Sequence, residues 1–106
     1  MKRYDIRWAD LDPVRRSETA KTRPVVIVSR NELNAALATV TVCPLTTQLH
    51  PTWRTRLPVR IGARDAEVAV DQIRAVSKHR LGRSTGRLSD SQARALRRLL
   101  TEAYGE

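Results

Sequence analysis

Arg23 and Thr46 are the two side chains whose positions first suggest chemistry. If the apolar segments 24–29 and 39–45 pair antiparallel across a short connection, residues whose numbers add up to about 68 or 69 lie opposite each other. Arg23 then faces Leu45 or Thr46, and Pro24 biases its backbone toward an extended conformation. A cation and a hydroxyl donor beside a polar loop could bind a phosphate group. A surface ion pair that caps the strand is an equally good interpretation of Arg23 from spacing alone.

Charge points to the class of partner. The 106 residues carry 20 lysine and arginine side chains against 11 aspartates and glutamates, so the formal net charge is +9. Such a surplus attracts polyanions through long-range steering and counterion release, which makes nucleic acid the leading partner class. A basic protein whose arginines only solvate its surface is the alternative. With 41% hydrophobic residues and no linker-like stretch, residues 1–106 are predicted to fold as a single domain.

Cysteine usage and the N-terminus bear on the compartment. The one cysteine, Cys43, lies in an apolar run and is expected to pack as a small hydrophobic side chain, which fits a reducing cytoplasm. Charged residues follow the basic start of residues 1–3, so neither a signal segment nor a membrane span is predicted. The protein is therefore expected to act in the cytoplasm, away from membranes.

The first half of the chain is predicted to contain three strands and a short helix. The strands are expected near residues 4–11, 24–29 and 39–45, the helix at 31–37, and a polar loop at 12–22. Ile6 and Trp8 share one parity of the first strand, as in a half-buried strand. Ser29 and Glu32 have the spacing of a capping box at the helix start. Pro44 cannot donate to a ladder, so it marks an edge, a bulge or the strand end.

The second half is predicted to add more strands and a C-terminal helix. A strand is expected to begin near Thr55, and a shift of apolar parity within 66–77 predicts a bulge near Asp71-Gln72. Ser89 and Gln92 form another capping-box pair, ahead of a helix from about 90 to 103. These elements predict a mainly β fold with helices: a small SH3-like β-barrel with a short helix after the second strand and a C-terminal helix.

A series of motifs then carries a family resemblance. They are Trp8-Ala9-Asp10-Leu11-Asp12-Pro13, Ser17-Glu18, Arg23-Pro24-Val25-Val26-Ile27-Val28-Ser29, Val42-Cys43-Pro44-Leu45-Thr46-Thr47-Gln48, Asp71-Gln72-Ile73-Arg74 and Gly86-Arg87-Leu88-Ser89. In this order and spacing, over about residues 4–100, the chain resembles toxins of the MazF/PemK family, which implies a CcdB/MazF-like fold. Two positions depart from that pattern. Tyr4 and Arg16 stand where the family usually has glycine, which tolerates backbone angles that other residues do not.

The resemblance implies a ribosome-independent endoribonuclease that cleaves single-stranded RNA by its own 2′-hydroxyl, leaving 2′,3′-cyclic phosphate and 5′-hydroxyl ends. Such a reaction needs a base, an acid and charge stabilisation at phosphorus. By motif match, Arg23 would clamp the phosphate and serve as a candidate acid, and Thr46 would donate a hydrogen bond to it. Arginine keeps its proton at neutral pH, so Glu18 is the candidate base, with an exposed loop carboxylate as the alternative.

The same resemblance implies that the protein needs neither a metal nor another cofactor. It also implies two partners, an acidic MazE-like antitoxin and single-stranded RNA. Base contacts are expected from Thr47, Gln48, Trp53 and Arg54, and phosphate contacts from Arg16 and Lys21. Trp53 could instead belong to a core or an interface.

Other residues and other functions compete with this interpretation. His50 and His79 are better explained as surface residues than as a catalytic pair, and Asp10 and Asp12 as a turn signal rather than a metal site. A homodimer is expected because the apolar faces of 25–28 and 73–76 exceed what one small barrel can cover. The competing functions are a CcdB-like toxin that binds DNA gyrase without cutting RNA, and a basic barrel that only binds RNA.

Overall fold

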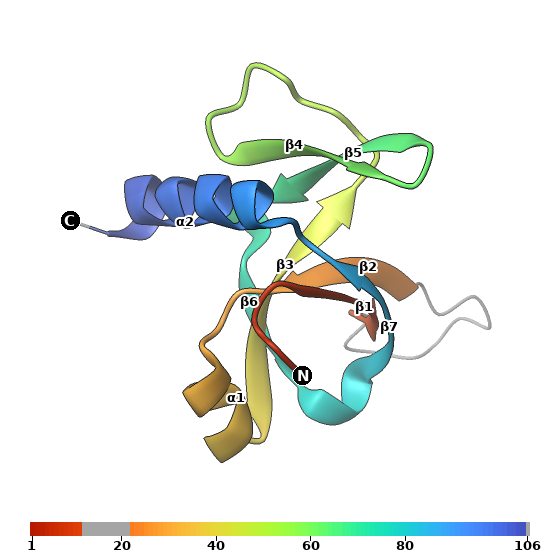
Figure 1. The fold of residues 1–106 in the computed structure, drawn as a ribbon, viewed down its shortest axis with the longest axis vertical. Coiled ribbons are helices and arrows are strands. Elements are labelled where there is room, and N and C mark those ends of the chain that lie inside the picture. Colours follow the sequence, from red (N-terminus) through yellow and green to blue (C-terminus); the bar gives the residue numbers. More distant parts are fainter. Residues whose placement is uncertain (12–21, 106) are drawn as a thin grey trace.

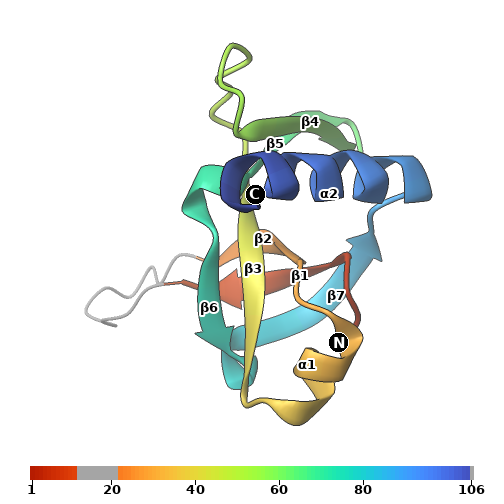
Figure 2. The same cartoon turned by 90° about the vertical axis from the view of Figure 1, so that its left-hand side faces the viewer.

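The computed structural model describes residues 1–11 and 22–105, in which seven antiparallel strands form one strongly curled sheet (Figures 1 and 2). The buried apolar side chains form two cores. The strands run in the order β4-β5-β3-β2-β1-β7, and β6 pairs with β3. The strands are β1 (Asp5–Asp10), β2 (Thr22–Ile27), β3 (Thr39–Thr46), β4 (Arg56–Ile61), β5 (Arg64–Ala69), β6 (Arg74–Ser77) and β7 (Leu81–Arg87). The helices are α1 (Asn31–Ala36) and α2 (Asp90–Tyr104), with the 3₁₀ turns η1 (Val70–Gln72) and η2 (Lys78–Arg80). The predicted mainly β fold with a short helix and a C-terminal helix is confirmed.

Strand β3 is the centre of the sheet because it changes partner along its length. Its residues 39–42 pair with β6, and Leu45 and Thr46 pair with β5. Pro44 lies at this change, where the β5/β6 side offers it no paired residue, while β2 pairs with it through Val25. The strand end offered for Pro44 is wrong, because β3 continues to Thr46 and pairs there with β5. The edge or bulge also offered fits the unpaired β5/β6 side, where the missing N–H of Pro44 interrupts no ladder.

Strand β2 is covered on both faces, as its run of β-branched residues predicts. Val26 and Val28 pack in one core with Leu96 of α2, and Val25 and Ile27 pack in a second core. All four are buried, with exposures of 0% to 6%, and Val76 of β6 is 4% exposed. The interpretation that residues 25–28 need a second copy to cover them is therefore wrong, because the single chain already covers them. In the second predicted face Val76 is buried, while Ile73 is partly exposed and Ala75 is exposed.

Strand β1 differs from a half-buried strand in a way that matters for the site. Ile6 is 5% exposed and pairs with Val26 of the first core, while Ala9 is 1% exposed in the second core. Trp8 pairs with Pro24 and is 37% exposed, because it lies where the first core opens toward solvent. Both faces of β1 are thus covered, and its tryptophan lies beyond the core rather than in it.

The local signals at turns and caps give a mixed result. Ser89 and Gln92 make the predicted capping box of α2, with Ser89 Oγ accepting from the Gln92 N–H at 3.2 Å. The capping box predicted for α1 is wrong, because Arg30 is the N-cap and makes no side-chain bond. Ser29 instead accepts from the Thr41 N–H at 3.0 Å, which ties the start of α1 to β3. The bulge predicted near Asp71-Gln72 is the 3₁₀ turn η1.

Neither helix in the described ranges has the length and apolar composition that a membrane-spanning segment requires.

Tyr4 has a backbone φ of +73°, which explains why glycine would suit this position. Its ring is nonetheless buried in the first core, beside the guanidinium of Arg3 at 4.9 Å and that of Arg97 at 5.9 Å. A non-glycine residue in the left-handed region costs about 1–2 kcal/mol, and burial of a large side chain returns about 1.5–3 kcal/mol.

Two substitutions of Tyr4 should separate these opposing contributions. Tyr4→Ala is expected to lower the free energy of unfolding more than Tyr4→Gly does, by about 1 kcal/mol, because both lose the ring and only glycine relieves the backbone. Urea denaturation of the two variants measures the difference. If the alanine variant is as stable as the glycine variant, the positive φ carries no strain.

Candidate active site

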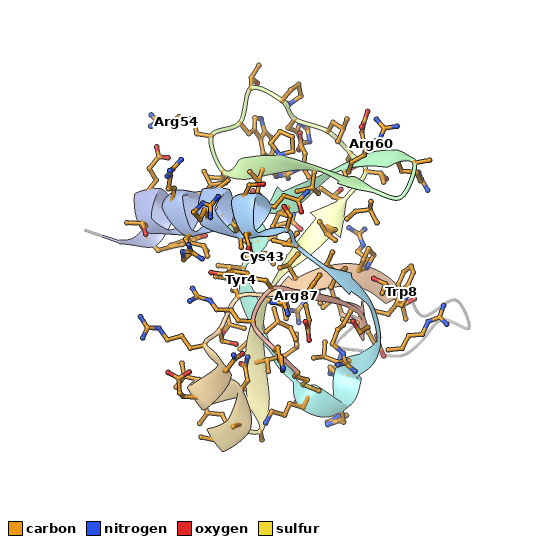
Figure 3. The ribbon with its side chains drawn as sticks, in the orientation of Figure 1. Tyr4, Trp8, Cys43, Arg54, Arg60 and Arg87 are labelled. Atoms are coloured by element: carbon orange, nitrogen blue, oxygen red, sulfur yellow. The ribbon has the colours of Figure 1, made fainter. Side chains whose placement is uncertain are left out.

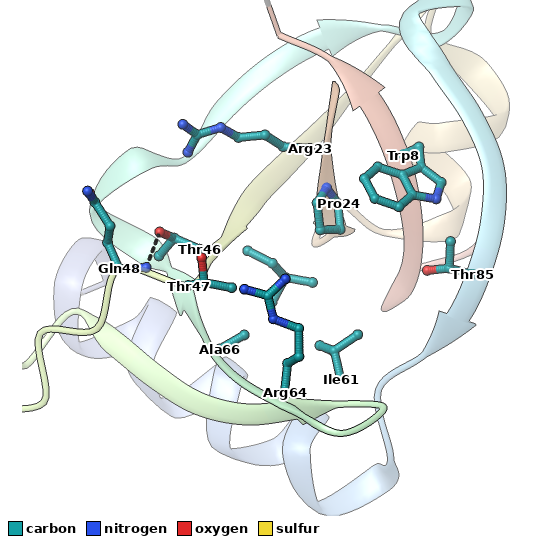
Figure 4. Close-up of a pocket in the computed structure, with 11 residues that line it drawn as sticks. Trp8, Arg23, Pro24, Thr46, Thr47, Gln48, Ile61, Arg64, Ala66 and Thr85 are labelled. Atoms are coloured by element: carbon teal, nitrogen blue, oxygen red, sulfur yellow. Dashed lines mark hydrogen bonds between the residues drawn. The ribbon is translucent and has the colours of Figure 1, made fainter. Parts of the chain in front are cut away.

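A pocket of about 540 Å³ opens where β2 begins, β3 ends and the β4–β5 hairpin turns (Figure 4). Its polar wall contains Arg23, Thr46, Thr47, Gln48 and Arg64. Its apolar part consists of Trp8, Pro24, Leu45, Ile61 and Ala66, drawn from five different strands and supplemented by Thr85 of β7. A cavity with a cationic wall and an apolar side suits a ligand that carries both a phosphate and a flat ring.

The register of β2 and β3 brings Arg23 and Thr46 to this pocket. The observed pairs are Val25 with Pro44, Val26 with Cys43 and Ile27 with Val42, and the same register continues to Arg23 opposite Thr46. The register predicted from the sequence is therefore confirmed. Both residues lie at the ends of their strands, where side chains are free of the ladder's packing and can face a ligand.

The hydroxyl of Thr46 is oriented by a turn that it helps to form. Thr46 Oγ1 accepts the backbone N–H of Gln48 at 3.1 Å, the bond drawn in Figure 4. A hydroxyl has one hydrogen to donate and two lone pairs to accept with. Because the Gln48 N–H occupies one lone pair, the hydroxyl hydrogen of Thr46 stays available to a ligand oxygen.

Arg64 is a site residue that the sequence interpretation missed. It follows the two-residue turn Gly62-Ala63, which closes the hairpin with Ile61 paired to Arg64 and with Gly62 at a φ of +61°. Figure 4 shows Arg64 reaching up from this hairpin and Arg23 extending from β2, with Thr46 and Thr47 between them. The signal in the sequence was the glycine turn, which predicts a hairpin but does not say what the hairpin faces.

The structure separates the other predicted RNA contacts into two groups. Thr47 and Gln48 line the pocket, whereas Trp53 and Arg54 do not. Trp53 stacks on His50 at 3.9 Å between ring centroids, and Arg54 donates to Glu102 of α2 at 2.7 Å. Figure 3 shows Arg54 and Trp8 on opposite sides of the molecule. Arg16, Glu18 and Lys21 lie outside the described residues, as does Asp12.

The cysteine and the histidines, which are the other reactive side chains considered, lie outside the pocket. Burial raises the pKa of the Cys43 thiol to about 12, with a smaller contribution from the charge of Asp71, so Cys43 packs as an uncharged side chain. His50 is occupied by its stack with Trp53, and His79 is exposed on η2. Within residues 1–11 and 22–105, no three His, Cys, Asp or Glu side chains gather as a metal site would need.

Comparison with known proteins identifies the family. Residues 2–104 match the family model described as PemK-like, MazF-like toxin of type II toxin-antitoxin systems. The endoribonuclease MazF9 of Mycobacterium tuberculosis is 31% identical over 101 residues, which cover 87% of this chain and 86% of that protein. The solved M. tuberculosis toxin MazF-mt6 superposes with a TM-score of 0.79 at 31% identity, covering 94% of this chain and 95% of that one.

A second solved structure, a mycobacterial endoribonuclease in complex with its cognate antitoxin, has the same fold. Its TM-score is 0.82 at 24% identity, over 99% of this chain and 95% of that one. The family suggested by the sequence motifs is thus confirmed over nearly the full length. The chain belongs to the PemK-like, MazF-like toxins of type II toxin–antitoxin systems.

Proposed function

We propose that this protein is an endoribonuclease toxin that cleaves single-stranded RNA by attack of the RNA's own 2′-hydroxyl. The observation that carries the proposal is the pairing of β2 and β3, which brings Arg23 and the oriented hydroxyl of Thr46 to one pocket. Relatives named as endoribonucleases, at 28% and 31% identity, support the same activity. The inhibition of translation and growth by such cleavage is part of the proposal.

The reaction follows from the groups around the phosphate. The 2′-oxygen loses its proton to a base and bonds to phosphorus, the bond from phosphorus to the 5′-oxygen breaks, and that oxygen takes up a proton. In this proposal Arg23 binds the non-bridging oxygens and is the candidate acid, Thr46 donates to one of them, and Glu18 is the candidate base. The negative charge that grows on these oxygens is then stabilised by donors already in position.

Arg64 and Trp8 extend the proposed substrate contacts beyond the scissile phosphate. Arg64 lies on the opposite side of Thr46 and Thr47 from Arg23, at a position suited to a neighbouring phosphate of the same strand. The partly exposed indole of Trp8, paired with Pro24 in the sheet, offers a surface for an unstacked base. Single-stranded RNA supplies both a neighbouring phosphate for Arg64 and a base for Trp8, since its bases are free to leave the stack.

An acidic antitoxin is the proposed partner that neutralises the toxin. The net charge of +9 favours an acidic chain, and related toxins have been solved with their antitoxins. Binding should weaken as salt rises because the attraction is screened. We expect the neighbouring open reading frame to encode a small acidic protein whose co-expression restores growth. The lack of such a reading frame, or its failure to restore growth, would contradict the assignment.

A homodimer remains part of the proposal, although the face of residues 25–28 first invoked for it is covered within one chain. Leu33 and Leu37 lie one helical turn apart at α1 and are 49% and 50% exposed, so apolar surface is still present. Sedimentation at micromolar concentration should give twice the mass of the chain. A stable monomer would confine the whole substrate groove to one chain.

The proposed function is tested by incubating the purified protein with an end-labelled synthetic RNA in the presence of excess EDTA. Cleavage is expected to persist, because the 2′-hydroxyl supplies the nucleophile and the donors are protein side chains. A protein that binds the RNA without cutting it would point to the RNA-binding barrel. Loss of cleavage in EDTA, with recovery on adding a divalent ion, would contradict the mechanism and return attention to Asp10 and Asp12.

A further inference from the structure

Arg56 and Glu67 form a buried ion pair on neighbouring strands outside the pocket. Their side chains are 4% and 3% exposed, and Arg56 NH1 lies 3.2 Å from Glu67 Oε1. Taking two charges out of water is unfavourable unless their remaining donors and acceptors are also used. The other groups that this pair binds therefore indicate what it does.

Those other groups belong to the segment that follows Thr46. Glu67 accepts the backbone N–H of His50 with both carboxylate oxygens, at 2.9 and 3.1 Å. Arg56 NH1 also donates to the carbonyl of Gln48 at 3.4 Å. Gln48 is thus held on both sides, since its own N–H donates to Thr46 Oγ1.

The far end of the same loop is fixed to the same cluster. Asp71 Oδ1 accepts from Arg56 Nε at 2.9 Å and from the Thr55 hydroxyl at 2.9 Å. Burial acts to raise the pKa of Asp71, but hydrogen bonds from Arg56, Thr55 and the backbone, together with the charge of Arg56, hold the pKa below its usual value, so the carboxylate stays charged. The guanidinium of Arg56 also lies 4.7 Å from the ring of Trp53. The cluster therefore fixes the loop between β3 and β4 at its beginning, its middle and its end.

We infer that Arg56 and Glu67 are positioning residues for the pocket: they hold the Gln48–His50 backbone so that Thr46, Thr47 and Gln48 already face the substrate before it binds. The catalytic part of this inference rests on the proposed function. The physical gain is preorganisation, because donors that are fixed in advance need no reordering as charge develops on the phosphate.

The first test measures the loop itself and needs no activity. The double variant Arg56→Met with Glu67→Met removes both charges of the buried pair at similar side-chain length, so neither partner is left buried without the other. Asp71, whose side chain is 29% exposed, then loses its bonds from Arg56 and keeps the one from Thr55. Hydrogen exchange followed by NMR should show the His50 amide exchanging at least about tenfold faster, while the amides of central strand β2 stay protected. Unchanged exchange at His50 would overturn the inference.

The matched control uses the exposed ion pair on the same two strands. Arg60 and Asp65 are 65% and 68% exposed and lie 3.1 Å apart, so Arg60→Met with Asp65→Met makes the same two substitutions at an exposed pair outside the loop between β3 and β4 (Figure 3 shows Arg60). This control should leave His50 exchange unchanged, and it serves the exchange measurement only, because Arg60 also donates to the carbonyl of Ala63 in the turn before Arg64. Should the first double variant fail to fold, Glu67→Gln provides a milder change in which one acceptor oxygen remains.

The second test asks whether the pair acts through Thr46. In the wild-type background the Arg56/Glu67 variant should lower kcat by about 10- to 100-fold with KM changed much less, since small misplacement of reacting groups has effects of that size. In a Thr46→Ala background the same change should have little further effect on kcat, although it should lower the melting temperature equally in both. Equal losses of kcat in both backgrounds would mean general destabilisation and would overturn the inference. If the wild-type protein does not cut RNA, the proposed function fails, and the exchange measurement still decides whether the pair holds the loop.

Discussion

Arg23→Ala is expected to lower the rate of RNA cleavage by about 10²–10³ while the protein stays folded. Loss of one donor that stabilises transition-state charge has an effect of about 3–4 kcal/mol. Arg23 is exposed at a strand end, so its contribution to stability should be that of a surface charge, about 0–1 kcal/mol. Single-turnover cleavage and thermal melting measure the two quantities separately.

The Arg23 prediction includes binding as well as catalysis. A guanidinium that clamps the phosphate contacts it in the ground state too, so Arg23→Ala should also weaken RNA binding. Arg23→Lys should recover part of the binding and less of the rate, because lysine keeps the charge and loses the planar fork. If Arg23→Ala retains more than about a tenth of the wild-type rate, against the effect expected for a lost transition-state donor, the site lies elsewhere.

Thr46→Val is the second large effect, and it should act mainly on the chemical step. Valine keeps the β-branched shape in the strand and removes the hydroxyl, so kcat should fall by about 10² or more while KM changes little. Thr46→Ser restores a hydroxyl that can still accept from Gln48 N–H, and it should recover most of the rate. A serine variant as slow as the valine variant would show that the hydroxyl is not the group that matters.

The register around Arg23 and Thr46 could be predicted from the sequence because local signals agree with each other. A β-branched run on each side of a short connection leaves few antiparallel registers, and the one observed is Val25 with Pro44. The capping box of Ser89 and Gln92 was equally readable, since both of its bonds lie within four residues. The strand register and the capping box depend on short segments of sequence, so contacts with distant parts of the chain do not change them.

The features that sequence reasoning missed depend on contacts between distant segments. Arg56 and Glu67 stand in polar positions of their strands and resemble ordinary solvated residues, yet the loop from β3 folds over them and buries both. The stack of Trp53 on His50 is a contact that only the folded loop creates, and it leaves Trp53 46% exposed, so the prediction that Trp53 contacts RNA stays a prediction. The apolar faces of β2 were assigned to a dimer because the sequence does not show how much of the sheet α2 and β6 cover.

The most direct test of the central claim first maps where the protein cuts a synthetic RNA. It then compares two forms of that RNA, which carry either a 2′-hydroxyl or a 2′-O-methyl group at the cleavage position. If the RNA's own 2′-oxygen attacks phosphorus, the unmodified RNA should give a 2′,3′-cyclic phosphate and a 5′-hydroxyl end, and the methylated linkage should remain intact under the same conditions. Cleavage of the methylated linkage at a comparable rate, or products that carry a 5′-phosphate, would contradict the account.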